Sequence, residues 1–224
     1  MLFTFWEGPM PAYVELCLAT WKRSFEVLTY KNLHNYSEID IKALQKFTLP
    51  QIADFVRVHV LRDHGGYWLD ADTIMLSNNL PEETMVGDPV TRTNSIGLLH
   101  AEKGSEMFKA WAEYQDEVVR DADLLNKWDI MGNRFTDPYL IEHPEIEIHP
   151  IWKYYPESYM MNYVTRFDNY RAFYFESNYH LKDLHEADLF MLHNSWTPGW
   201  YKTLTKLEVL GLDLTMSNIL REAI

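Results

Sequence analysis

The run from Leu61 to Leu76 constrains the fold more than any other part of the chain. It passes from the end of an expected helix, through Gly65 and Gly66, into an apolar stretch that carries Asp70 and Asp72. We predict that this stretch is a β-strand, in which successive side chains alternate between the two faces. Asp70 and Asp72 would then point the same way and share one divalent cation or one polyhydroxylated ligand.

The chemistry of this acidic pair favours a hard metal. Carboxylate oxygens suit Mg²⁺ or Mn²⁺, and such ions are commonly held by one or two protein carboxylates together with substrate phosphate oxygens. An ordinary turn or a solvated strand end gives the same D-x-D pattern. The pair therefore indicates a nucleotide substrate only in combination with its surroundings.

The segment before the pair, Pro50 to His64, has the pattern of an amphipathic helix. Proline suits the first helical turn, and apolar residues recur at helical spacing through the segment. Asp54 and Arg57 are three residues apart on another face, which is close enough for them to form an ion pair. We expect this pair to present a polar fork beside the strand that follows.

Together, A-D-F-V-R and G-G-Y-W-L-D-A-D resemble the signature of the sugar transferases of glycosyltransferase family 32. That signature is a Ser/Ala-Asp-x-x-Arg helix, a Gly-Gly-x-Tyr turn and a D-x-D. The resemblance implies a Rossmann-like α/β domain of the GT-A type with a central mixed sheet. It also implies a metal-dependent, retaining transfer of a sugar from a UDP- or GDP-sugar to a glycan acceptor, with Mn²⁺ or Mg²⁺ as cofactor.

Two further segments extend the resemblance to nearly the whole chain. Near the start, F-T-F-W-E-G-P-M-P matches an apolar strand that runs into Trp-x-Gly. Near the end, Ala187 to His193 is an expected strand that closes on a His with a Ser-Trp after it. An indole at the carboxyl end of a strand can stack on a nucleobase, although a tryptophan there is also commonly part of the core.

The resemblance assigns roles to individual residues. Asp70, Asp72 and Asn94 are the expected catalytic residues, with Asn94 lining the donor sugar. The expected donor-binding residues are Trp6 on the nucleobase, Asp54 and Arg57 on the sugar, and Ser195 and Trp196 on the diphosphate. The expected metal ligands are Asp70, Asp72 and His193, since a His with two carboxylates gives a mixed set that Mn²⁺ accepts.

Composition narrows the class of protein. A chain of 224 residues without an evident linker predicts a single domain over residues 1–224. The balance of 20 basic and 33 acidic residues, a net charge of −13, argues against nucleic acid or an anionic membrane as the main partner. With one cysteine, no apolar stretch of ~20 residues and no hydrophobic signal core, we expect a cytoplasmic protein without a transmembrane segment.

The remaining pattern predicts alternating strands and helices. The expected elements are strands at Met1–Phe5, Ser24–Tyr30, Met85–Asp88 and Ser95–Leu99, a helix from Pro11, and a long helix from Glu102 to Arg120. Residues 121–170 have poor periodicity and many aromatic residues, notably in residues 152–156 and 159–163. Such residues suit an acceptor sugar site or an irregular core equally well.

Two other functions fit parts of the sequence. L-D-A-D-T-I-M-L also resembles the first motif of haloacid-dehalogenase-like phosphatases, in which the first aspartate, here Asp70, attacks phosphorus. Those enzymes need a later acidic pair, and Gly87-Asp88 comes too soon to supply it. A catalytically silent sugar-binding protein of the same fold is the third hypothesis.

Overall fold

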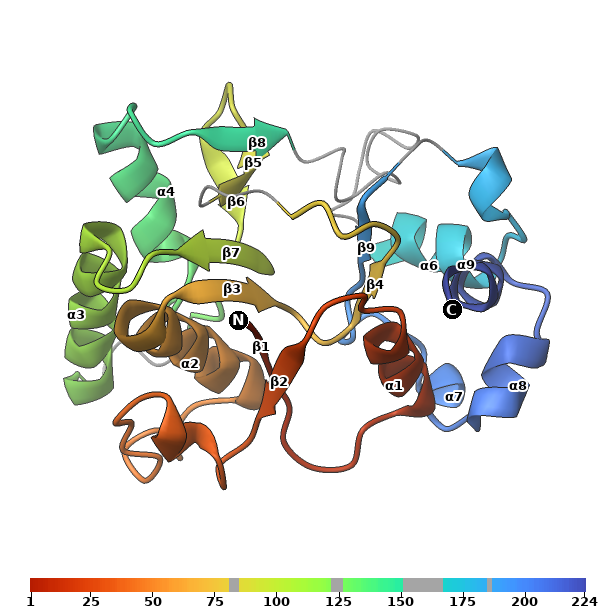
Figure 1. Ribbon diagram of the computed structural model, residues 1–224, viewed down its shortest axis with the longest axis horizontal. Helices are drawn as coiled ribbons and strands as arrows, with labels where there is room; N and C mark the ends of the chain where they lie inside the picture. The colour runs from red at the N-terminus through yellow and green to blue at the C-terminus, as the bar shows by residue number, and fades with distance from the viewer. Residues whose placement is uncertain (81–84, 122–126, 151–166, 185–186) are drawn as a thin grey trace. The chain divides into compact units, whose positions relative to one another are not determined.

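The computed structural model describes residues 1–80, 85–121, 127–150, 167–184 and 187–224 (Figure 1). The chain forms two compact units. Unit 1 consists of Met1–Glu7, Ser24–Asp70 and Pro81–Pro150, and unit 2 consists of Gly8–Arg23, Ala71–Leu80 and Ile151–Ile224. The single domain expected over the whole chain stays a prediction. Residues 152–156 and 159–163, whose aromatic composition suits an acceptor site, lie outside the described residues.

Unit 1 is built on a four-stranded mixed sheet in the order β2-β1-β3-β7. Strand β1 (Leu2–Phe5) pairs in parallel with β2 (Phe25–Leu28) and with β3 (Gly66–Leu69). Strand β7 (Leu98–Ala101) pairs with β3 in the antiparallel direction. The expected α/β class with a central mixed sheet is therefore confirmed.

A second sheet of unit 1 has the order β6-β5-β8. It consists of β5 (Met85–Asp88), β6 (Thr93–Ser95) and β8 (Ile148–Pro150). Strand β5 confirms the prediction for its residues. The single strand expected at Ser95–Leu99 is wrong, because the chain leaves β6 after Ser95 and enters a different sheet as β7.

Unit 1 also contains helices, and the longest of those described packs against its central sheet. The helices are η1 (Leu33–Asn35), α2 (Leu49–His64), α3 (Glu106–Arg120) and α4 (Asn133–Glu142). Helix α2 begins at a capping box, in which the Thr48 backbone N–H donates to the Gln51 side chain at 3.0 Å. The apolar face of α2 contacts α3, β1, β3 and β7 (Figure 1). These contacts hold α2 in place, and with it the side chains of Asp54 and Arg57.

The two glycines after α2 lie where other parts of the backbone come close: Gly65 beside Ala101 and Lys103 at the end of β7, and Gly66 beside Met1 at the start of β1. Gly65 and Gly66 have φ values of +73° and +105°, which L-residues with side chains rarely adopt. A Cβ on Gly66 would lie 2.5 Å from the carbonyl oxygen of Met1, the same oxygen that accepts the Tyr67 N–H at 2.9 Å. Any side chain here would therefore separate the two strands.

The D-x-D segment is a turn, so the prediction of one strand carrying both aspartates is wrong. Strand β3 ends at Leu69, Asp70 has no regular secondary structure, residues 71 and 72 form a turn, and β4 spans Thr73–Met75. Strand β3 pairs within the central sheet of unit 1, whereas β4 pairs with β9 in unit 2. Because each strand belongs to its own sheet, the backbone between them cannot stay in one extended register.

Unit 2 is mainly helical around one short pair of strands. Strand β4 pairs in the antiparallel direction with β9 (Leu189–Met191), which confirms the closing strand. Figure 1 shows α1 (Ala12–Ala19) and α9 (Thr215–Ala223) near β4, and both helices contact this strand. The other elements are α6 (Phe167–Phe175), η4 (Leu181–Asp183), α7 (Gly199–Lys202) and α8 (Lys206–Gly211). None of the helices in the described ranges is long and apolar enough to cross a bilayer.

Candidate functional site

In unit 1, Arg57 forms the centre of a buried ion cluster. Its Nη2 atom lies 2.9 Å from Oδ1 of Asp54 and 3.1 Å from Oδ1 of Asp70. Its Nη1 atom donates to the carbonyl oxygen of Ile96, and only 5% of the side chain is exposed. The predicted Asp54–Arg57 ion pair is present, and it also holds the first aspartate of the D-x-D.

Asp70 is fixed through one oxygen. Its Oδ1 accepts a hydrogen bond from the indole N–H of Trp68 at 2.9 Å as well as the ion pair from Arg57. Its Oδ2 has no hydrogen bond or ion pair with any residue in the described ranges, and 35% of the side chain is exposed. The guanidinium of Arg57 lies 5.2 Å from the centre of the Trp68 ring. Asp70 therefore offers an oriented, accessible carboxylate oxygen.

Asp54 is a buried carboxyl with a raised pKa. Burial raises the pKa of Asp54 to about 6, since the stabilising charge of Arg57 is partly offset by the like charge of Asp70. The Asp54 carboxyl thus titrates close to neutral pH. A group of this kind either donates or accepts a hydrogen bond toward a ligand hydroxyl, depending on pH.

Asn94 lies in β6 and is held by the first turn of α4. Its Oδ1 accepts hydrogen bonds from Thr136 Oγ1 at 2.7 Å and from Asn133 Nδ2 at 3.3 Å. The same Asn133 amide donates to the Asn94 carbonyl oxygen at 2.7 Å. The side-chain oxygen is already used, and the amide nitrogen donates one hydrogen to the Met85 sulfur at 3.7 Å, so the second hydrogen of this amide can serve a ligand.

Trp6 directly follows β1, at the carboxyl end of that strand. Its backbone N–H continues the sheet by donating to the Leu28 carbonyl oxygen at 3.0 Å, and its side chain is half-buried. The indole Nε1 is buried and has no hydrogen-bond partner among the described residues. Buried polar groups usually have a partner, so this N–H is a candidate contact for a bound ligand.

In unit 2, Asp72 is held by the chain that follows β9. The backbone N–H of Asn194 donates to Asp72 Oδ2 at 2.6 Å, and the N–H of Leu192 donates to the Asp72 carbonyl oxygen at 3.1 Å. Residues on both sides of His193 therefore bind Asp72. The last strand was expected to run beside the D-x-D segment. This is confirmed for Asp72, because β9 pairs with β4, the strand that directly follows Asp72.

The imidazole of His193 lies in an aromatic setting. Its ring centre is 4.2 Å from that of Trp196 and 5.6 Å from that of Tyr170, and its backbone N–H donates to the Tyr170 hydroxyl at 3.2 Å. Burial lowers the pKa of His193 to about 4, so the ring is neutral at neutral pH, as metal ligation requires. Trp196 is half-buried and Ser195 is exposed.

The sequence-predicted residues fall into two groups. Unit 1 holds Trp6, Asp54, Arg57, Asp70 and Asn94, and among these the structure joins Asp54, Arg57 and Asp70. Unit 2 holds Asp72, His193, Ser195 and Trp196, and here the structure joins Asp72 to the segment that starts at His193.

Sequence reasoning missed several residues that hold these groups in place. The placement of Trp68 two residues before Asp70 was an available signal, because residues two apart on a strand share a face. No local pattern marks Asn194, or Tyr13, whose hydroxyl donates to Asn194 Oδ1 at 2.6 Å. Thr136 and Asn133 likewise gave no signal.

The side chains available to hold the expected cation are few. The described residues contain no group of three or more His, Cys, Asp or Glu placed to hold a metal ion. Two carboxylates with hard oxygen atoms still fit an ion that takes its other ligands from substrate phosphates and water. Asp70 and Asp72 are therefore suitable in chemistry for Mg²⁺ or Mn²⁺.

One family model matches most of the chain. Residues 2–188 match a family model described as "Capsular polysaccharide synthesis protein". This match includes every candidate residue of unit 1 and Asp72, and ends before His193, Ser195 and Trp196. A solved structure titled PaToxG Glycosyltransferase is similar with a TM-score of 0.45 and 10% identity, over 63% of this chain and 67% of that chain. No curated protein matches the chain.

Proposed function

The chain belongs to the capsular polysaccharide synthesis protein family, and we propose that it is a metal-dependent, retaining glycosyltransferase. Its donor would be a UDP- or GDP-sugar and its acceptor a glycan. The family supports a role in building a polysaccharide, a process that needs transfer of activated sugars. The resemblance of the D-x-D region to glycosyltransferase family 32 supports the finer assignment, including a GT-A type of fold and a retaining outcome.

The observation that carries this proposal is the fixation of Asp70 through one oxygen. Arg57 and Trp68 both bind Oδ1, while Oδ2 makes no hydrogen bond or ion pair with the described residues. Partners that hold one oxygen orient the other and tune its affinity, as they do around metal-binding carboxylates. An aspartate that is only solvated at the surface does not need to be held by a buried arginine and an indole N–H.

We assign the cation to Asp70 and Asp72, and we propose that His193 joins them as a third ligand only when the donor is bound, because the described residues form no group of three metal-binding side chains by themselves. One residue separates the two aspartates, so their Cα atoms are at most about 7.6 Å apart. When bound, the cation supplies a Lewis acid that stabilises the charge developing on the departing nucleotide diphosphate.

The other residues bind and orient the donor. In the proposal Trp6 stacks on the nucleobase, and Ser195 and Trp196 contact the diphosphate. Asp54 and the amide nitrogen of Asn94 bind sugar hydroxyls, since each presents a polar group beyond its contacts within the protein. Arg57 acts through Asp54 and Asp70, because its guanidinium is buried and already satisfied by protein groups.

A panel of UDP- and GDP-sugars tests the proposal. The purified protein is incubated with each donor and Mn²⁺, with and without EDTA, and scored for hydrolysis of the donor and for thermal stabilisation. We expect one donor to be hydrolysed only with the metal, and Asp72→Asn to lower this rate at least about a hundredfold with the fold intact. Glu102→Gln, which removes one exposed negative charge, is the matched control.

Other outcomes would identify the competing functions. Hydrolysis of p-nitrophenyl phosphate that depends on Asp70, without turnover of any nucleotide sugar, would indicate a phosphatase. Stabilisation by a sugar without turnover of any donor would indicate a binding protein. Either result contradicts the proposed transfer.

A further inference from the structure

We propose that Tyr13 is a positioning residue for Asp72. Its hydroxyl fixes the side chain of Asn194, and the backbone N–H of Asn194 in turn fixes the Asp72 carboxylate. All three residues belong to unit 2. The inference deepens the proposed function and rests on it, because it concerns how tightly Asp72 binds a divalent cation.

The geometry forms a continuous chain of two short hydrogen bonds. Tyr13 Oη donates to Asn194 Oδ1 at 2.6 Å, and the Asn194 backbone N–H donates to Asp72 Oδ2 at 2.6 Å. Tyr13 lies in α1 and its side chain is fully buried. Burial and the nearby charge of Asp72 raise the pKa of the Tyr13 hydroxyl, so this group keeps its proton and acts as the donor.

The Tyr13 contact is separate from the hydrogen bonds that form the turn itself. The N–H groups of Trp196 and Thr197 donate to the His193 carbonyl oxygen at 2.9 and 3.0 Å, which closes the turn without the Asn194 side chain. That side chain instead reaches α1. The Asn194 N–H belongs to the same planar peptide group as the His193 carbonyl oxygen, so the turn and this N–H move as one unit. Without the Tyr13 hydroxyl, the turn loses a contact that ties it to α1, and the N–H can shift away from Asp72 together with the turn.

Tyr201 provides a matched control. It is as deeply buried as Tyr13, belongs to the same unit, and its ring centre lies 5.8 Å from that of Tyr13. Its hydroxyl pairs with Ser217 Oγ at 3.0 Å and is not bonded to Asn194. Tyr201→Phe therefore removes a buried hydroxyl from the same core without touching the contact to Asp72.

The experiment is a calorimetric titration of Mn²⁺ in the presence of saturating UDP or GDP, whichever stabilises the wild-type protein. We expect Tyr13→Phe to weaken Mn²⁺ binding about 10–100-fold, the usual effect of losing a partner of a metal-binding residue. Tyr201→Phe should leave the Mn²⁺ affinity within about twofold of wild type while lowering the melting temperature about as much as Tyr13→Phe does.

Asn194→Ala is the second variant, since it keeps the backbone N–H and removes the acceptor of the Tyr13 hydroxyl. It should weaken Mn²⁺ binding as much as Tyr13→Phe, and the double variant should be no worse than either single one. Unchanged affinity in Tyr13→Phe, or additive losses in the double variant, would overturn this inference alone. A wild-type protein that binds no Mn²⁺ with either nucleotide would overturn the metal-dependent function as well.

Discussion

Asp72 and Asn194 are 122 residues apart in the sequence, yet Oδ2 of Asp72 accepts the backbone N–H of Asn194 at 2.6 Å. The antiparallel pairing of β4 with β9 makes this contact possible, because it brings the end of the last strand beside the start of β4. Leu192 also binds Asp72 through its backbone. The backbone of His193 therefore lies next to the second aspartate of the D-x-D.

We expect His193→Ala to weaken Mn²⁺ binding in the presence of the donor nucleotide. Only a neutral imidazole binds metal, and burial lowers the pKa of His193 to about 4. The contribution of His193 should consequently persist through pH 6.5 and disappear only as the pH approaches 4. Calorimetric titrations of wild type and variant at several pH values measure this difference.

The double variant His193→Ala with Asp72→Asn tests whether both residues serve one ion. Its loss of Mn²⁺ affinity should be smaller than the sum of the two single losses. If His193→Ala alone leaves the Mn²⁺ affinity unchanged, His193 is not a ligand. Asp70 and Asp72 are then the only proposed protein ligands of the ion.

Trp6→Ala should raise the donor KM more than it lowers kcat. Stacking on a base is equally strong in the ground and transition states, so its loss of ~1–3 kcal/mol appears as about a fivefold to hundredfold change in KM. Steady-state kinetics with varied donor measure both constants. Trp128→Ala, at a tryptophan that is 82% exposed, is the control. An unstable Trp6→Ala protein with an unchanged KM would place Trp6 in the core.

Arg57→Lys should lower activity far more than a similar change at the surface. A lysine cannot reach Asp54, Asp70 and the Ile96 carbonyl oxygen at once, because its ammonium is a single point charge without a planar fork. We expect a loss of activity of at least about tenfold and a measurable loss of stability, since a buried ion cluster is left incomplete. Kinetics and urea unfolding should show little effect of Arg134→Lys, whose pair with Asp129 is partly exposed. Near-normal activity in Arg57→Lys would argue against its role in orienting Asp70.

The free energy of unfolding should fall as the pH drops below 6.5, and His59 should account for part of this fall. Burial lowers the pKa of His59 to about 3, so between pH 6.5 and 3 the unfolded chain takes up a proton that the folded protein does not. Between pH 6.5 and 5 this costs about 1–2 kcal/mol. Asp54 has the opposite effect, because its raised pKa favours proton uptake by the folded protein as the pH falls below about 6.

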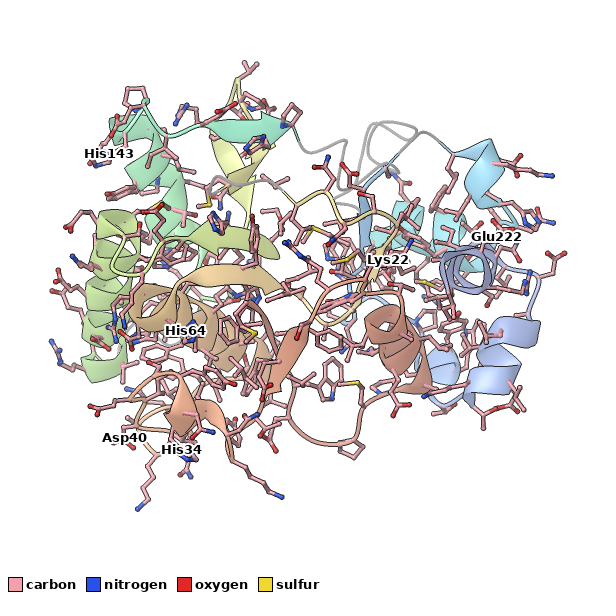
Figure 2. All side chains as sticks on the ribbon, viewed as in Figure 1. Lys22, His34, Asp40, His64, His143 and Glu222 are labelled. Atoms are coloured by element: carbon pink, nitrogen blue, oxygen red, sulfur yellow. The ribbon has the colours of Figure 1, made fainter. Side chains whose placement is uncertain are left out.

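Comparison of variants isolates the contribution of His59. Urea unfolding of His59→Leu at pH 7 and pH 5 should show a smaller pH dependence than the wild-type protein shows. His34→Leu serves as the control, because His34 is exposed and is labelled at the lower edge of Figure 2. Equal pH dependence in wild type and His59→Leu would mean that His59 titrates normally.

The sequence determined those features that depend on neighbouring residues. Pro50, the apolar spacing after it and the two glycines at 65 and 66 set the limits of α2, and the structure places that helix at Leu49–His64. The Asp54–Arg57 pair followed from helical spacing alone. The resemblance to a sugar transferase also came from short motifs, and the family match agrees with polysaccharide synthesis.

Tertiary structure alone decided which groups hold the two aspartates. Local pattern predicted one strand through Asp70 and Asp72, but strand pairing is a property of whole sheets, and β3 and β4 pair with different partners. The bonds from Asn194 to Asp72 and from Tyr13 to Asn194 join residues 122 and 181 positions apart. Contacts at such separations leave no periodicity in the sequence, because they arise only when the folded chain has closed these long loops.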